Sequence, residues 1–155
     1  MDVHSKAVRS KNMRAIRSKN TKPELLVRWL LHTQGFRFRL HARKLPGTPD
    51  IVLKKYNAVI FVHGCFWHGH NCHLFSMPKT RTEFWSKKIN DNRRRDKLAY
   101  KQLISNGWRV LYIWECALQG RKKLNQVRLT DTIEEWLMTE EFSAEISYLG
   151  VTTLN

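Results

Sequence analysis

Apolar residues recur at intervals of three and four positions in three stretches of the sequence, and this spacing predicts three amphipathic helices. The first helix begins with the capping box at residues 21–24, Thr-Lys-Pro-Glu, and ends at Gly35. A second capping box at residues 80–83, Thr-Arg-Thr-Glu, starts a long helix that ends before Gly107. The third helix is expected near residues 129–138.

Alternating and continuous apolar runs predict the strands between these helices. Apolar and basic residues alternate over residues 36–41, as in a strand with one solvated, basic face. The runs 50–53 and 58–62 flank the turn Lys-Lys-Tyr-Asn and predict a hairpin, and a further apolar strand is expected at residues 108–114. Residues 64–81 lack periodicity, and a loop of this length is usually functional.

Strands interleaved with helices indicate an α/β or α+β fold, with a mixed central sheet flanked by helices on both faces. The 155 residues leave room for one globular core, so residues 1–155 are expected to form a single domain. Hydrophobic residues make up 42% of the chain, which is enough to bury that core and argues against general disorder.

Basic residues dominate the charged positions, because 28 Lys and Arg stand against 13 Asp and Glu and give a net charge of +15. This excess indicates a polyanionic partner. Nucleic acid is favoured over a membrane surface, since no apolar run approaches the roughly 18 residues of a transmembrane helix and no amphipathic anchor is evident. Residues 1–20 hold six Lys or Arg among few apolar residues and are interpreted as a basic arm for this partner.

Histidine and cysteine are concentrated in residues 63–73, which contain four histidines and two cysteines. The N-terminus does not resemble a signal peptide, so the three cysteines are expected in a reducing cytoplasm, where metal binding is favoured over disulfides. Cys65, His70 and Cys72, joined by Cys116, supply the four ligands of a Cys₃His structural zinc site. The alternative is a buried free thiol at Cys116 and merely polar histidines, although the loop has few apolar side chains to order it.

Asp50 opens one arm of the predicted hairpin, and the other arm ends twelve residues later at Val62, followed by His63. This layout resembles that of Mg²⁺ nucleases of the restriction-enzyme type, in which a strand aspartate holds the metal. The acid and lysine usual on the second strand of those enzymes are absent, and Val62 and His63 stand there instead. The dipeptide Pro49-Asp50 by itself is also a common turn sequence.

Longer motifs indicate a narrower family. Together they resemble the very short patch repair (Vsr) endonucleases over about residues 3–140, in the segments 9–16, 46–50, 61–72, 81–85 and 108–116. The resemblance implies a restriction-endonuclease-like fold and an Mg²⁺-dependent DNA endonuclease. Members of this family nick T:G mismatches 5′ of the thymine, where 5-methylcytosine has deaminated, and thereby initiate very short patch repair.

Family roles transfer by position onto five residues of this chain. The resemblance implies that Asp50 binds Mg²⁺ ions, two in number, together with the main-chain carbonyl of Val62, where the family often has threonine. His68 then activates or orients the attacking water, and His63 contacts the phosphate or assists the leaving oxygen. Glu24 holds metal-bound water, although its place in the capping box gives it a competing structural role. The family's zinc ligands are the same four residues assigned above.

Phe66 and Trp67 lie between the zinc ligands, so the metal would hold two aromatic side chains outward as wedges that unstack bases. Family members use these positions in this way, with Met13 of the N-terminal DNA-binding arm entering from the other groove. Ordinary burial in the core is the alternative for all three residues. Contacts to phosphates are expected from basic residues of the arm and the long helix, namely Arg14, Lys87, Lys88 and Arg93.

Asn92 and Asp96 share a face of the long helix, and we expect them to face the active site and orient a histidine; projection into solvent is the alternative. The expected substrate is double-stranded DNA with a T:G mismatch, bound by a monomer at the nucleoid of a bacterial cytoplasm. Mismatch-repair proteins are further candidate partners. Two other functions fit parts of the sequence: a non-catalytic zinc module that binds nucleic acid, which leaves Asp50 without a task, and a restriction-type endonuclease that cuts both strands.

Overall fold

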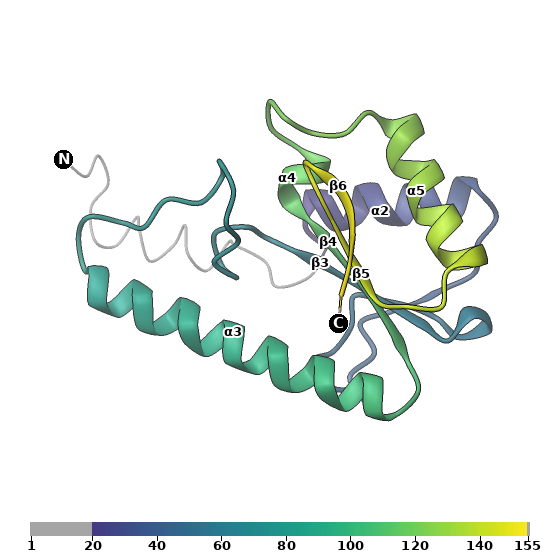
Figure 1. The fold of residues 1–155 in the computed structure, drawn as a ribbon, viewed down its shortest axis with the longest axis horizontal. Coiled ribbons are helices and arrows are strands. Elements are labelled where there is room, and N and C mark those ends of the chain that lie inside the picture. The colour runs from purple at the N-terminus through teal and green to yellow at the C-terminus, as the bar shows by residue number, and fades with distance from the viewer. Residues whose placement is uncertain (1–19, 155) are drawn as a thin grey trace.

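A mixed sheet of six strands lies at the centre of the computed structural model, which describes residues 20–154 (Figure 1). The strands are β1 (Arg39–Leu40), β2 (Ile51–Leu53), β3 (Ala58–His63), β4 (Arg109–Trp114), β5 (Ala144–Ser147) and β6 (Gly150–Thr153). They follow one another in chain order across the sheet. Neighbours from β1 to β3 are antiparallel, β3, β4 and β5 are parallel, and β6 is antiparallel to β5.

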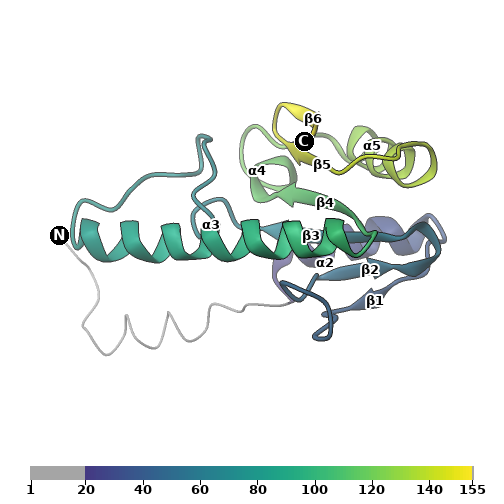
Figure 2. The same cartoon turned by 60° about the horizontal axis from the view of Figure 1, so that its bottom comes forward.

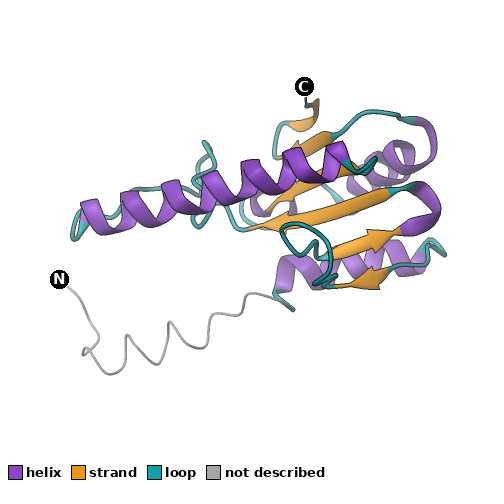
Figure 3. Cartoon of the chain, turned by 90° about the horizontal axis from the view of Figure 1, so that it is seen from below, coloured by secondary structure: helices purple, strands orange, loops and turns teal. Residues whose placement is uncertain are grey.

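Helices cover both faces of this sheet, as the sequence pattern predicts. α2 (Lys22–Thr33) and α5 (Gln126–Thr139) lie on one face, and α3 (Thr82–Ser105) crosses the other (Figure 3). Alternate residues of β3 divide between the two sides, because Ile60 belongs to the core beneath α2 and α5 and Phe61 to the smaller core beneath α3. The described residues therefore form a single domain with the sheet between two apolar layers.

The N-terminal half of α3 projects beyond the strand ends, and residues 64–81 run beside it (Figure 2). Two short helical elements complete the structure: η1 (Lys54–Tyr56) within the β2–β3 hairpin and α4 (Glu115–Leu118) directly after β4. Between residues 20 and 154, none of the helices has the length and apolar character needed to cross a membrane.

The predicted first helix and the hairpin are confirmed. Thr21 caps α2, since its Oγ1 accepts from the Glu24 amide N–H at 3.4 Å, and Asn57 closes the hairpin in a left-handed conformation with φ of 51°. The strand expected over residues 36–41 is shorter, because only Arg39 and Leu40 pair with β2. β2 has only three residues and offers no further partners for pairing. Phe36 and Phe38, which precede β1, therefore pack against the core without pairing to a strand.

The second capping box, predicted at residues 80–83, is wrong. α3 begins at Thr82, and the preceding Arg81 adopts a left-handed conformation with φ of 53° and makes no side-chain capping bond. The Thr82 hydroxyl donates instead to the Pro78 carbonyl at 2.9 Å. Because Arg81 turns the chain immediately before the helix, Thr80 does not occupy the N-cap position.

Arg109, the first residue of β4, joins the sheet to the end of α5. Its guanidinium donates to the carbonyls of Tyr56, Trp136, Leu137 and Glu140 at 2.8 to 3.2 Å. It also lies 4.4 Å from the centroid of the Trp136 ring. The carbonyls at a helix C-terminus lack partners within the helix, so this one side chain satisfies several of them at once.

We expect Arg109→Lys to lower the free energy of unfolding by about 2–4 kcal/mol, because an ammonium group cannot reach four carbonyls with the planar fork of a guanidinium. Urea denaturation followed by circular dichroism measures the change. Arg121→Lys, at an exposed turn, is the matched control and should shift stability by less than about 0.5 kcal/mol. Equal effects of the two substitutions would contradict the role given to Arg109.

Candidate active site and metal centre

The hairpin fixes the carboxylate of Asp50 beside the end of β3. Asp50 directly precedes β2, and its Oδ2 accepts a hydrogen bond from the Val62 amide N–H at 2.7 Å. On its other side, the His41 amide donates to the Asp50 carbonyl at 3.0 Å. Asp50 is therefore held from both neighbouring segments of the sheet.

Glu24, from the first turn of α2, reaches the same place. Its side chain is almost fully buried, and its Oε2 lies 2.9 Å from His41 Nε2 and 2.5 Å from the Arg28 guanidinium. One ligand atom from each of Glu24, His41 and Asp50 lies within 4.8 Å of the others. These three side chains come from separate segments, so the group forms only when α2 docks beside the hairpin.

Sequence reasoning missed Arg28 and His41. The spacing of four residues between Glu24 and Arg28 predicts an ion pair on the surface of α2 and could have identified the arginine. No local signal marks His41, because its contact with Glu24 depends on the pairing of β1 with β2.

Burial of Asp50 raises the pKa of its carboxyl to about 7, with a further contribution from the Glu24 carboxylate. The hydrogen bond from Val62 and the charge of Arg28 oppose this shift. A divalent cation between the carboxylates would favour their ionised forms. The oxygen donors of Asp50 and Glu24 match the preference of a hard cation such as Mg²⁺.

Two histidines stack next to this group. The rings of His63 and His68 are 3.7 Å apart at their centroids and nearly parallel, with an interplanar angle of 2°. Burial lowers the pKa of His63 well below its usual range, and the neighbouring His68 lowers it further, which favours the neutral imidazole. Asp96 of α3 places its Oδ2 2.5 Å from His68 Nδ1. Since the carboxylate accepts at Nδ1, the Nε2 of His68 is left free for other partners.

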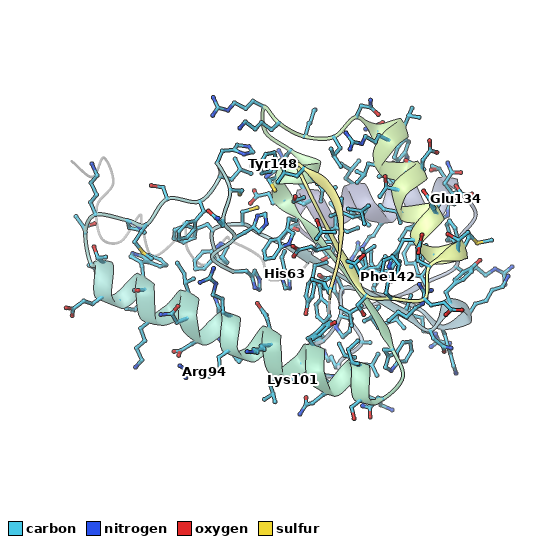
Figure 4. The ribbon with its side chains drawn as sticks, in the orientation of Figure 1. His63, Arg94, Lys101, Glu134, Phe142 and Tyr148 are labelled. Carbon is cyan, nitrogen blue, oxygen red and sulfur yellow. The ribbon has the colours of Figure 1, made fainter. Side chains whose placement is uncertain are left out.

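The carboxylate and the histidines open into one cleft of about 440 Å³. Its lining includes Asp50, His63, His68, Asp96 and His41. Figure 4 shows His63 in the space between the sheet and α3. The structure thus brings together the acidic residue at the hairpin and the two imidazoles that the sequence singled out.

Four metal-ligating side chains meet on the other side of the histidines. One ligand atom from each of Cys65, His70, Cys72 and Cys116 lies within 4.8 Å of the other three. His70 Nδ1 is 3.6 Å from the Cys65 sulfur and 3.7 Å from the Cys116 sulfur. Tetrahedral coordination with the usual Zn–S and Zn–N bond lengths requires about 3.6 Å between such atoms. The donor set and its spacing therefore fit Zn²⁺.

The sheet holds this cluster in place through β4 and α4. Glu115 Oε1 accepts from the Cys65 amide at 3.1 Å, and the next residue, Cys116, is buried at the start of α4. The proximity of Cys116 and burial both raise the pKa of the Cys65 thiol. A bound cation would reverse this preference, because metal binding deprotonates cysteine.

Phe66 and Trp67 are half-buried outside the two cores, and they contact Trp85 of α3 with ring centroids 5.5 and 5.7 Å apart. Asn92 donates to the Trp67 carbonyl at 2.9 Å and forms no hydrogen bond with a histidine in the described residues. This hydrogen bond gives no support to the expectation that Asn92 orients a histidine. At this position, α3 instead binds the backbone of the loop 64–81.

Exposed basic side chains line the outer side of α3, where Arg94 and Lys101 point away from the body of the protein (Figure 4). Lys87 and Lys88 are also exposed. Arg93 differs, because its guanidinium donates to the carbonyls of His68 and Gly69 and ties α3 to the loop. Met13 and Arg14 lie outside the described residues, as does all of the arm except residue 20.

A carboxylate and paired imidazoles in a cleft next to a basic helix form an arrangement suited to hydrolysis of a nucleic-acid phosphodiester. A family model described as "DNA mismatch endonuclease Vsr" matches residues 1–74. The chain is also 52% identical over 153 residues to the DNA mismatch endonuclease Vsr of Escherichia coli (strain K12), covering 99% of this chain and 98% of that protein. The chain therefore belongs to the Vsr DNA mismatch endonuclease family.

Two further relatives are named as nicking enzymes. The type II nicking enzyme V.XorIIP of Xanthomonas oryzae pv. oryzae is 55% identical over 122 residues, which cover 79% of this chain and 89% of the relative. The type II nicking enzyme V.NmeAIP of Neisseria meningitidis is 45% identical over 130 residues, which cover 81% and 93% of the two chains. The chain is accordingly a nuclease that acts on the phosphodiester bonds of DNA.

We expect His70→Ala and Cys116→Ser each to lower the content of tightly bound zinc from one ion per chain, because each removes one of four converging donors. Elemental analysis of the purified protein measures this content. His73→Ala is the matched control, since His73 follows Cys72 directly but stands outside the donor cluster. A full zinc content in both ligand variants, or an equal loss in the control, would contradict the assignment.

Proposed function

We propose that this protein is an Mg²⁺-dependent, strand-specific endonuclease that nicks 5′ of the thymine in T:G mismatches. Such mismatches arise when 5-methylcytosine deaminates, and the nick initiates very short patch repair. The observation that carries the proposal is the meeting of Asp50, His63 and His68 in one cleft of a chain that belongs to the Vsr family. The mixed sheet with an acidic residue at its β2–β3 hairpin also supports a restriction-endonuclease-like fold.

Asp50 and the main-chain carbonyl of Val62 would hold Mg²⁺, two ions in all, with Glu24 binding a coordinated water. The N–H and C=O of one strand residue point to the same side, so the bond from the Val62 amide to Asp50 also directs the carbonyl toward this edge. Valine preserves a contact made by the backbone. When bound, Mg²⁺ supplies charge neutralisation at the phosphate and lowers the pKa of a water molecule.

His68 would activate or orient the attacking water, with Asp96 fixing its tautomer through Nδ1. His63 would contact the scissile phosphate or assist the leaving oxygen. The two stacked rings line the same cleft, which supports a role for both at one phosphate. The neutral state of His63 suits a hydrogen-bonding group better than a fixed positive charge.

The Cys₃His cluster would hold one structural Zn²⁺. All four positions of a tetrahedral site are then filled by protein ligands, which is the arrangement of a structural ion and leaves no position for substrate. The ion would stiffen a long loop that contains His68 and the aromatic residues Phe66 and Trp67.

Phe66 and Trp67 would insert between bases at the mismatch, where unstacking costs least, and Met13 would enter from the opposite groove. Trp85 supports both aromatic rings from behind. Residues 1–20 form the DNA-binding arm of a single domain spanning residues 1–155. Contacts to phosphates come from basic residues that position the enzyme without reading sequence, namely Arg14, Lys87, Lys88 and Arg93.

The substrate is double-stranded DNA, bound by a monomer, and mismatch-repair proteins are further partners in the bacterial cytoplasm.

Two alternative functions would leave different DNA products. A non-catalytic zinc module binds the mismatch and leaves it intact, and a restriction-type enzyme cuts both strands of a matched duplex. The first alternative is disfavoured because it gives no purpose to the carboxylates of Asp50 and Glu24, which are costly to bury.

We expect Asp50→Asn to abolish nicking of a T:G duplex while its dissociation constant for that duplex stays within about threefold, because the carboxylate acts on the metal and not on the bases. A denaturing gel with each strand labelled separately measures the product, with Mg²⁺ or with EDTA. A matched C:G duplex is the substrate control. Cleavage of both strands, or a wild-type protein inert toward every T:G context with Mg²⁺, would overturn the proposal.

We expect Asp96→Asn to slow single-turnover nicking by about 10- to 100-fold, because His68 loses the acceptor that fixes its Nδ1 proton. Asp91→Asn, on the same helix and paired only with Arg94 at 3.7 Å in the described residues, should nick at the wild-type rate. Rapid-quench measurement at saturating enzyme separates this step from binding. Full activity of Asp96→Asn would show that its contact with His68 is merely structural.

A further inference from the structure

Trp114, the last residue of β4, lies between the Cys₃His cluster and the paired histidines. Its indole stacks on the metal-ligand candidate His70, with ring centroids 4.1 Å apart and planes at 9°. The same indole meets His63 and His68 edge to face, with centroids 5.3 and 6.3 Å away and interplanar angles of 72° and 71°. One side chain therefore contacts both centres.

The indole is fixed on the sheet. Its Nε1 donates to Glu145 Oε2 of β5 at 3.1 Å, and Trp114 sits directly opposite His63 in the parallel pairing of β3 with β4. A hydrogen bond on one edge and a stacked ring on one face leave the indole little rotational freedom. It is thus a rigid contact for its neighbours.

His63 depends on such packing for its orientation. Its Nδ1 is buried and has no hydrogen-bond partner among residues 20–154. Most active-site histidines are oriented through a hydrogen bond at one ring nitrogen, but here ring contacts hold the imidazole. These contacts come from His68, Trp114, Tyr112 and Phe61.

We propose that Trp114 is a positioning residue, which transmits the placement of His70 in the Cys₃His cluster to the imidazoles of His63 and His68. This inference rests on the proposed nicking activity. It adds to that activity a residue that is neither a carboxylate of the cleft nor a candidate metal ligand. Reacting groups must be placed to within a fraction of an ångström for full activity, so a small rotation of either imidazole slows the chemical step.

Single substitutions separate positioning from folding. Trp114→Phe retains an aromatic ring against His70, whereas Trp114→Leu removes it. Trp108→Leu, one residue before the same strand and packed against the core beneath α3, is the matched control. We expect single-turnover nicking of a T:G duplex to fall about 10- to 100-fold in Trp114→Leu and less than about threefold in Trp114→Phe and Trp108→Leu. Zinc content and the dissociation constant for DNA should stay at wild-type values in all three.

A double-mutant cycle tests the link to the metal centre. His70→Cys keeps four zinc ligands but removes the stacked ring, so it should slow nicking through the same contact as Trp114→Leu. The combined variant should then lose little more than the larger single loss, while His70→Cys and Trp108→Leu should combine additively. As a readout besides activity, His70→Cys should shift the ring-proton resonances of His63 and His68, and should no longer do so when Trp114 is leucine.

Nicking at the wild-type rate in Trp114→Leu overturns the inference, as does a loss that follows zinc content, folded fraction or DNA affinity. Additive losses in the cycle, or ring-proton shifts that persist without the indole, overturn it equally. A wild-type protein that fails to nick T:G duplexes contradicts the proposed function instead. In that case the resonances of His63 and His68 still decide whether Trp114 couples the two centres.

Discussion

The hydrogen bond from the Val62 amide to the Asp50 carboxylate is the contact on which the cleft depends. It forms only in the observed register of β2 and β3, in which Ile51 lies opposite Ile60. A slip of one residue would turn the apolar residues of the hairpin from one core to the other and carry Asp50 away from His63. The register that the apolar side chains of the hairpin favour therefore determines the geometry of the polar site.

A second constraint joins the irregular segment 64–81 to this sheet. Three consecutive residues, the last of β4 and the first two of α4, contact that segment, each through different chemistry. Trp114 stacks on His70, Glu115 accepts from the Cys65 amide, and Cys116 contributes a thiol. A long irregular loop loses much conformational entropy when it is ordered. Contacts with three consecutive residues where β4 passes into α4 offset part of that cost, and the proposed zinc ion would add to them.

Elements with strong local signals could be predicted from the sequence: the cap of α2, the hairpin, and a cysteine and histidine set whose members do converge. Features that depend on tertiary pairing could not. His41 reaches Glu24 only because β1 pairs with β2, and Arg109 gives no sequence signal that its guanidinium will satisfy four distant carbonyls. The capping box at residues 80–83 failed for a related reason, since the left-handed Arg81 takes the N-cap position and α3 starts one residue later than the pattern indicates.

α3 connects the parts proposed for recognition and for chemistry. Within little more than one helical turn, Asn92 holds the Trp67 carbonyl, Arg93 holds the carbonyls of His68 and Gly69, and Asp96 holds the His68 ring. Trp67, which is proposed to enter the DNA, and His68, which is proposed to act on the phosphate, are thus both bound to α3. In the proposed function, this shared helix would couple the base that is unstacked to the phosphate that reaches the cleft, so that the nick would fall at one defined position.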